Sequence, residues 1–208
     1  MTTIAQRRGL NDSGTVLHWY DFICPFCYVG QQRNTILAGR GFDVVQLAFQ
    51  AHPDIPPGGI SAGPRNGLIY VMLERETKEA GLVLNWPRHL PNTRRSLAAA
   101  EWVRRHQPGA FPRLQKELFA AHFVLGEDLE DHDVIDRHAS VSGVDLAYLH
   151  AAFADGSAME ALAGAAMIGR QYGVQGTPAW LFPQGMITGL RPVSDFERLA
   201  HDAMRLAQ

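Results

Sequence analysis

The sequence has few cysteines, little net charge and no long apolar run, and each shortage narrows what the protein can be. Only two cysteines occur among 208 residues, which is too few for a disulfide framework. The 19 basic and 21 acidic residues leave a net charge of −2, so we expect no nucleic-acid partner. No apolar run approaches the ~18 residues of a membrane span, and the N-terminal segment has no apolar core typical of a secretory signal. We therefore expect a cytoplasmic protein with no membrane partner.

The two ends of the sequence alternate strand and helix patterns. Residues 15–22 and 42–50 are rich in β-branched and aromatic side chains and predict strands, and residues 25–38 between them have helical periodicity. Residues 174–182 predict another strand, followed by a hairpin connection, a short strand and a terminal helix. A strand, a helix and a strand within about 35 residues indicate a parallel pair, so the fold class is α/β.

The middle of the sequence is almost entirely helical in pattern, and this contrast suggests a division into parts. We expect a flexible N-terminal arm at 1–13, an α/β domain formed by 14–65 together with 173–208, and an all-helical insertion domain at 66–172. The last helix of the insertion, which begins at Ser157, is a candidate to pack on the α/β domain. The first is expected to bury a face with Leu68, Met72 and Leu73. The predicted N-terminal caps of later helices are Asn92, Asp131, Asp145 and Ser157, the last in a capping box with Glu160.

Both cysteines belong to the segment Cys24-Pro25-Phe26-Cys27, at the predicted junction of a strand and a helix. The N–H groups and dipole at a helix N-terminus stabilise an anion, and the thiolate is the nucleophilic form of cysteine. Cys24 is therefore the predicted attacking thiol, and Cys27, one turn further on the same face, can resolve a mixed disulfide. Pro25 suits the first helical turn, and Phe26 brings no charge that could tune the thiol.

Three interpretations of this segment compete. A redox pair accounts for the spacing, the junction and the lack of other cysteines. A zinc site needs about four ligands, and neither a second C-x-x-C segment nor clustered histidines are present. Two inert core cysteines are the third interpretation. We favour the redox pair and expect no metal.

A second candidate feature is Gly176-Thr177-Pro178, just before the strand that ends at residue 182. A proline at the start of a strand is ordinary, and an X-Pro bond in a turn can be cis. Taken with the cysteine pair, the segment becomes a candidate for the other side of a redox site.

Other polar residues are weaker candidates for the site. Asp21 either tunes the thiols or ends a strand, His18 and His52 are expected to be a satisfied strand histidine and a loop residue, and His122 faces either the core or a cleft.

The cysteine pair and the Gly-Thr-Pro segment resemble the thioredoxin superfamily, and the helical insertion resembles its DsbA-like branch. Several segments are similar to FrnE-like proteins, which are related to 2-hydroxychromene-2-carboxylate isomerase. These segments are DFICPFCYVG, FQAHPDIPPGG, NTRRSLAAAEWV, LFAAHFVLGEDLEDHDVI and YGVQGTPAWLF. The resemblance implies a thioredoxin-like fold with a helical insertion, over about residues 15–206.

The resemblance also implies roles for individual residues. Cys24 would be the nucleophile, Cys27 the resolving thiol, and Pro178 a cis-proline, with Thr177 and Gly176 contacting substrate through the backbone. Two positions depart from the family pattern. Phe26 replaces a common tryptophan and Thr177 a frequent valine, and both changes bear on reduction potential and substrate preference.

The leading functional hypothesis is a thiol–disulfide oxidoreductase acting on protein or low-molecular-weight disulfides and dithiols. It needs no cofactor beyond the redox-active cysteines, although glutathione is a candidate co-substrate. One alternative is a glutathione-dependent isomerase or kappa-type transferase; such relatives usually lack the second cysteine, which this chain retains. The other alternative is a non-catalytic, chaperone-like binding module.

Overall fold

The computed structural model describes residues 14–206, so the predicted arm at 1–13 lies outside the described residues. A four-stranded sheet in the order β2-β1-β5-β6 forms the centre of this part of the chain. Its strands are β1 (Thr15–Tyr20), β2 (Asp43–Ala48), β5 (Ala179–Phe182) and β6 (Gly185–Thr188). β1 runs parallel to β2 and antiparallel to β5, which in turn pairs with β6. The strands predicted near the two ends of the sequence are therefore neighbours in one mixed sheet.

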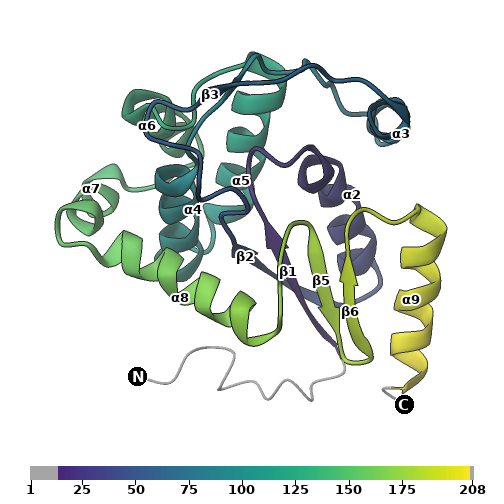
Figure 1. Ribbon diagram of the computed structural model, residues 1–208. Coiled ribbons are helices and arrows are strands. Elements are labelled where there is room, and N and C mark those ends of the chain that lie inside the picture. The colour runs from purple at the N-terminus through teal and green to yellow at the C-terminus, as the bar shows by residue number, and fades with distance from the viewer. Residues whose placement is uncertain (1–13, 207–208) are drawn as a thin grey trace.

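Helices cover both faces of the sheet (Figure 1). Helices α2 (Pro25–Gly39) and α9 (Val193–Leu206) pack on one face. The apolar cluster on that face joins β1 and β5 to the two helices. It contains Val16 of β1, Trp180 of β5, Leu37 of α2 and Phe196 of α9. Helix α8 (Ser157–Gln171) packs on the other face, where Ala165 shares a cluster with Trp19. β1 is thus buried on both sides, which explains its nearly continuous apolar sequence.

The remaining helices lie between β2 and α8 in the chain. They are α3 (Leu68–Glu79), α4 (Arg94–His106), α5 (Phe111–Ala120), α6 (His132–Val141) and α7 (Leu146–Ala154). In Figure 1, α4 to α7 are grouped above and to the left of the sheet, α9 lies to its right, and α3 is set apart. A π-helical turn, η1 (Ala121–Leu125), continues α5. A two-residue pair, β3 (Ile60–Ser61) with β4 (His89–Leu90), was not predicted and ties the two flanks of α3 together.

An aromatic cluster joins the sheet to these helices. Phe119 of α5 lies with its ring centroid 5.0 Å from that of Phe22 and 5.9 Å from that of Tyr28. Tyr28, on α2, also stacks on Phe123 of η1 at 4.9 Å. The helix that begins at the cysteines is therefore held against the insertion by rings from three elements.

The predicted helix caps were partly correct. The side chains of Asp131 and Asp145 accept backbone hydrogen bonds and cap α6 and α7, as predicted. The capping box of Ser157 and Glu160 is wrong. The residue before α8 is Gly156, with φ 85°, and the Ser157 N–H donates to the Asp155 carboxylate instead. A tight left-handed turn between α7 and α8 therefore replaces the extended cap residue that a capping box requires.

Two further predictions shift in detail. Asn92 accepts a hydrogen bond from the Arg94 N–H, as a cap would, but the residue that directly precedes α4 is Thr93. The buried face of α3 is narrower than predicted. Leu73 is buried, whereas Leu68 is 87% exposed, because α3 meets the rest of the protein along a single stripe that begins after its first turn.

Candidate functional site

The two cysteines lie at the start of α2, as the sequence predicts. Cys24 precedes the helix in an extended conformation, with Pro25 at the first helical position. The carbonyl oxygen of Cys24 accepts hydrogen bonds from the N–H groups of Cys27 and Tyr28 at 3.0 and 3.1 Å. Both cysteines are free thiols; Cys24 is half-buried and Cys27 is fully buried. The chain therefore presents one thiol at the helix N-terminus and keeps the other behind it.

The segment before β5 lies directly against the first thiol. The Thr177–Pro178 peptide bond is cis, which is the isomer that the resemblance implies. The Cys24 thiol donates a hydrogen bond to the carbonyl oxygen of Thr177 at 3.3 Å, across 153 residues of sequence. Close packing of α2 on β5 makes this contact possible. A Cβ added at Gly30 would lie only 3.1 Å from a ring carbon of Trp180, so glycine lets the helix approach the strand.

The two thiols have opposite electrostatic environments. Burial alone would raise the pKa of Cys24, but hydrogen bonding by Cys27 and the proximity of Thr177 outweigh it and lower that pKa below 9.0. Burial raises the pKa of the Cys27 thiol well above the ordinary value, and the neighbouring Cys24 adds to the effect. Cys24 is therefore the thiol that ionises first, and the thiolate is the reactive form.

Asp21 lies behind the cysteines and is fully buried. Its carboxylate accepts hydrogen bonds from the N–H groups of Ala51 at 2.8 Å and Ile23 at 3.4 Å, and its carbonyl oxygen accepts one from the Cys24 N–H. Burial raises the pKa of Asp21, although the backbone donors oppose the change. The residue thus ties the end of β1 to the loop after β2 while placing a carboxyl group near the thiols.

A pocket of about 480 Å³ opens beside Cys24. Of the predicted site residues, it is lined by Cys24, Pro25, Phe26, Gly176 and Thr177. The other predicted site residues, namely Asp21, Cys27 and Pro178, are buried and do not line it. The structure thus separates the predicted site into an accessible layer and a supporting layer.

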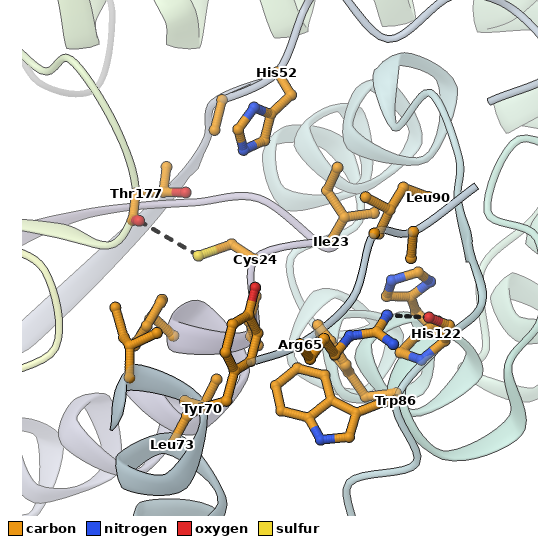
Figure 2. Close-up of a pocket in the computed structure, with 18 of the residues that line it drawn as sticks. Ile23, Cys24, His52, Arg65, Tyr70, Leu73, Trp86, Leu90, His122 and Thr177 are labelled. Atoms are coloured by element: carbon orange, nitrogen blue, oxygen red, sulfur yellow. Dashed lines mark hydrogen bonds between the residues drawn. The ribbon is translucent and has the colours of Figure 1, made fainter. Parts of the chain in front are cut away.

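Much of the pocket comes from residues that we did not assign to the site. Figure 2 shows Cys24 and Thr177 on one side and Arg65, Trp86 and His122 on the other. We call Cys24, Gly176 and Thr177 the sulfur end, and Arg65, Trp86 and His122 the histidine end. The three residues of the histidine end come from the segments flanking α3 and from η1. They are far apart in sequence and have no shared motif, so only the tertiary fold brings them together.

The histidines considered from sequence have different positions. His18 is buried in the sheet, stacks on Trp180 at 4.6 Å between ring centroids and is hydrogen-bonded to Asn34, as expected of a satisfied strand histidine. His52 lines the pocket from an exposed loop. His122, whose orientation the sequence left open, is buried and lines the pocket.

Neither a metal cluster nor a membrane helix is found among residues 14–206. No three His, Cys, Asp or Glu side chains in that range are placed to hold a metal ion together. No helix in the same range combines the length and apolar character needed to cross a bilayer.

Comparison with known proteins identifies the family. The model of the DSBA-like thioredoxin domain matches residues 15–200, so the chain belongs to the DsbA-like thioredoxin family. The expected fold, thioredoxin-like α/β with a helical insertion, is thereby confirmed. No curated protein matches the sequence.

Several solved structures are similar in fold. A probable DsbA oxidoreductase from Streptomyces coelicolor aligns over 92% of this chain and 90% of its own, with 19% identity and a TM-score of 0.75. A 2-hydroxychromene-2-carboxylate isomerase aligns over 92% and 95%, with 22% identity and a TM-score of 0.71. The cytosolic disulfide reductase DsbM from Pseudomonas aeruginosa, solved with glutathione, aligns over 92% and 99%, with 16% identity and a TM-score of 0.64. At these identities the likeness concerns the fold alone.

Proposed function

We propose that the protein is a thiol–disulfide oxidoreductase that uses Cys24 as nucleophile and Cys27 as resolving thiol. The observation that carries the proposal is the position of Cys24. Its sulfur lies at the N-terminus of α2 and 3.3 Å from the carbonyl oxygen of Thr177, with Cys27 in the following turn. The oxidoreductases among the structural neighbours support the same class of reaction.

In the reductive direction, the Cys24 thiolate attacks one sulfur of a substrate disulfide. A bond forms between Cys24 and that sulfur, the substrate S–S bond breaks, and the other substrate sulfur leaves as a thiolate. Cys27 then attacks the sulfur of Cys24, the bond between Cys24 and the substrate sulfur breaks, and that sulfur leaves as a thiolate that takes up the proton lost by Cys27. The result is a Cys24–Cys27 disulfide and a reduced substrate, a two-electron exchange. An external dithiol or thiol pair restores the protein, and the reverse sequence oxidises a dithiol.

The lowered pKa of Cys24 and the raised pKa of Cys27 suit the two thiols to different steps of the reaction. The lowered pKa of Cys24 increases the fraction of its thiolate, which is the attacking form, and in the oxidative direction it makes Cys24 a good leaving group when a second substrate thiol attacks the mixed disulfide. Cys27 stays protonated and buried until a mixed disulfide forms, so it does not compete for substrate. No metal or organic cofactor takes part in this scheme, and glutathione is a candidate electron donor.

Substrate is held, in this proposal, by the backbone beside the thiol. The N–H and C=O groups of Thr177, together with Gly176, offer hydrogen bonds to an extended chain that adds to the strand edge. Phe26, half-buried at the pocket rim, supplies apolar contact. A cytoplasmic location belongs to the same proposal. It is supported by the presence of only two cysteines in the sequence. It also fits the need of a reductive cycle for a pool of thiols that returns electrons to the cysteine pair.

The test is reduction of insulin and of a small disulfide with dithiothreitol as the electron source. Wild type is expected to turn over both substrates, and Cys24→Ser is expected to be inactive. Thr35→Ser, a small change on the exposed side of the same helix, is the matched control and should retain activity. Turnover by wild type that does not exceed that of Cys24→Ser would overturn the proposal.

The direction of electron flow is measured separately, by equilibrating the Cys24–Cys27 pair with glutathione buffers. A potential near roughly −270 mV makes the protein a reductant, and one near roughly −120 mV makes it an oxidant.

A further inference from the structure

His122 is a buried polar side chain without a partner. It is 0% exposed, and neither ring nitrogen has a hydrogen-bond partner among the described residues. Its ring contact among residues 14–206 is with Phe123, edge-on at 4.7 Å between ring centroids. Leaving a buried donor or acceptor unsatisfied costs about 1–3 kcal/mol, so such a group calls for an explanation.

The backbone around His122 is also unusual. The residue lies in η1, a π-helical turn that ends at Gly126 with φ 69°. Such turns are rare and are frequently found at functional sites. Here the turn brings the imidazole to the pocket wall, where it is one of the lining residues.

Arg65 brings a positive charge to the same end of the pocket. Its guanidinium group lies over the Trp86 ring, 4.9 Å from the centroid, and donates a hydrogen bond to the carbonyl oxygen of Pro87. A guanidinium has five N–H donors, so others are left for a ligand. The residues that line the pocket include no aspartate or glutamate. The nearby carboxylate of Asp128 lies 3.4 Å from His89 rather than in the lining.

The protonation of His122 suits a hydrogen-bonding role. Burial lowers its pKa to about 4, the Glu127 backbone opposes this, and electrostatic interactions with His89 and Arg65 reinforce it. The ring is therefore neutral at physiological pH, with one N–H donor and one acceptor nitrogen. A neutral donor beside an arginine can bind an anion, and burial strengthens both interactions.

We propose that the histidine end binds the carboxylate of a low-molecular-weight thiol or disulfide whose sulfur meets Cys24 at the sulfur end. Arg65 supplies the charge, the His122 N–H donates a hydrogen bond, and the apolar lining between the two ends accommodates the linking carbons. This inference rests on the proposed redox function and specifies the substrate class of that site. A pocket of about 480 Å³ lies within the size range of small-molecule sites.

The first experiment compares three small disulfides of different charge: dithiodiglycolate, bis-hydroxyethyl disulfide and cystamine. The readout is the ratio of kcat/KM for dithiodiglycolate to that for the neutral disulfide. A charge-assisted hydrogen bond is expected to favour dithiodiglycolate about tenfold or more in wild type. Arg65→Gln and His122→Phe should each lower the ratio toward one, and cystamine should be the poorest substrate.

Arg88→Gln is the matched control. It removes one positive charge from an exposed residue next to the pocket segment but outside the lining, so the ratio should stay at the wild-type value. An equal loss in Arg88→Gln and Arg65→Gln would reduce the effect to net charge and overturn the inference. If no disulfide is reduced at all, the proposed function fails; if all three are reduced with similar kcat/KM, only this inference fails.

A second experiment needs neither variants nor turnover. Thiodiglycolate carries the same carboxylates on a thioether, so it cannot react with Cys24. Adding it to wild type should shift the His122 ring resonances in the NMR spectrum and raise the pKa of His122, because a bound carboxylate favours the protonated ring. Unchanged His122 resonances at saturating thiodiglycolate would contradict the inference even if every disulfide is reduced.

Discussion

The sulfur end and the histidine end of the pocket differ in how their polar groups are satisfied. At the sulfur end, the Cys24 thiol donates a hydrogen bond to the Thr177 carbonyl oxygen and the Cys24 N–H donates one to the Asp21 carbonyl oxygen, although the Thr177 hydroxyl lacks a partner among the described residues. At the histidine end, both ring nitrogens of His122 lack a partner among the described residues. The reactive sulfur is thus held by hydrogen bonds within the protein, whereas the imidazole of His122 keeps both of its nitrogens available for the ligand that we propose.

This comparison separates changes that stop the reaction from changes that alter its selectivity. Variants at the sulfur end should affect every substrate, because in the proposed reaction each substrate exchanges its sulfur with Cys24. Variants at the histidine end should act on some substrates more than others. Variants of the buried residues that support the pocket should lower the free energy of unfolding more than they change the reaction.

The largest effect is expected from Cys27→Ser. Intramolecular attack by a positioned group has an effective concentration far above that of any external thiol, so turnover should fall by at least about a thousandfold. The Cys24 mixed disulfide should accumulate and be visible by mass spectrometry. Cys24→Ser, treated in the same way, should form no adduct. Undiminished turnover in Cys27→Ser with glutathione would instead favour a single-thiol, glutathione-dependent reaction.

The next largest effect concerns the aromatic cluster that joins α2 to α5. Phe119 is 1% exposed and packs on Phe22 and Tyr28, which flank the cysteine segment. Phe119→Ala should lower the free energy of unfolding by about 3–5 kcal/mol, measured by urea denaturation. Leu68→Ala, at an 87% exposed position on α3, is the control and should change it by less than about 0.5 kcal/mol. A loss below 1 kcal/mol in Phe119→Ala is on the order of a surface change. It would contradict the claim that this aromatic cluster holds α2 and α5 together.

The third prediction concerns pH and tests the burial of the histidine end. The pKa of His122 falls from 6.5 to about 4 on folding, so the unfolded chain binds more protons between those values. Stability supplied by the neutral ring is present above pH 6.5 and is lost as the pH falls toward 4; this loss amounts to about 3 kcal/mol. His122→Phe should therefore show a shallower decline in unfolding free energy across that range than wild type.

Two other groups also affect the pH dependence of the unfolding free energy. The contribution of His122 is therefore obtained by comparing variants rather than from the wild-type profile alone. Buried His18, with a pKa near 3, acts in the same sense as His122, and Asp21, whose pKa is raised, acts in the opposite sense. A variant of exposed His132, His132→Asn, serves as the control and should follow the wild-type profile. Identical slopes in His122→Phe and wild type would show that the His122 ring is not held neutral by burial.

The smallest effect is expected from Asp21→Asn. The negative charge of Asp21 raises the pKa of Cys24, although it is the least of the contributions to that pKa. Removing the charge while keeping a carbonyl acceptor for the Ala51 N–H should lower the pKa of Cys24 further. The measurement is the ultraviolet absorbance of the thiolate as a function of pH. A rise in that pKa would contradict the placement of the carboxyl group near the thiol.

The parts of the fold that were predictable have strong local patterns. β1, α2 and β2 follow one another with clear changes of periodicity, and the helix begins at Pro25 as its missing N–H suggests. The β3–β4 pair was missed because two residues per strand carry no periodicity. Ser157 looked like a cap because the spacing to Glu160 was right, but the left-handed Gly156 before it follows from how α7 meets α8.

The candidate site was predictable only where chemistry and sequence coincide. Cys24 and Cys27 share one turn, and Thr177–Pro178 was recognisable through the resemblance. Arg65, Trp86 and His122 belong to no motif, since the pocket they line exists only after the helical insertion has packed against α2. The π-helical form of η1 also has no sequence signal, because the same residues fit an ordinary α-helix.

The contact between Cys24 and Thr177 has a consequence for the order in which the protein is made. The two residues are 153 positions apart, so at roughly 5–20 residues per second a ribosome adds Thr177 about 8–30 s after Cys24. During that interval the emerging chain has Cys24, β1 and β2, but neither the Thr177 carbonyl group nor β5, the strand on the other side of β1. The newly made chain thus carries both cysteines and the whole histidine end before the sulfur end is completed by Gly176 and Thr177.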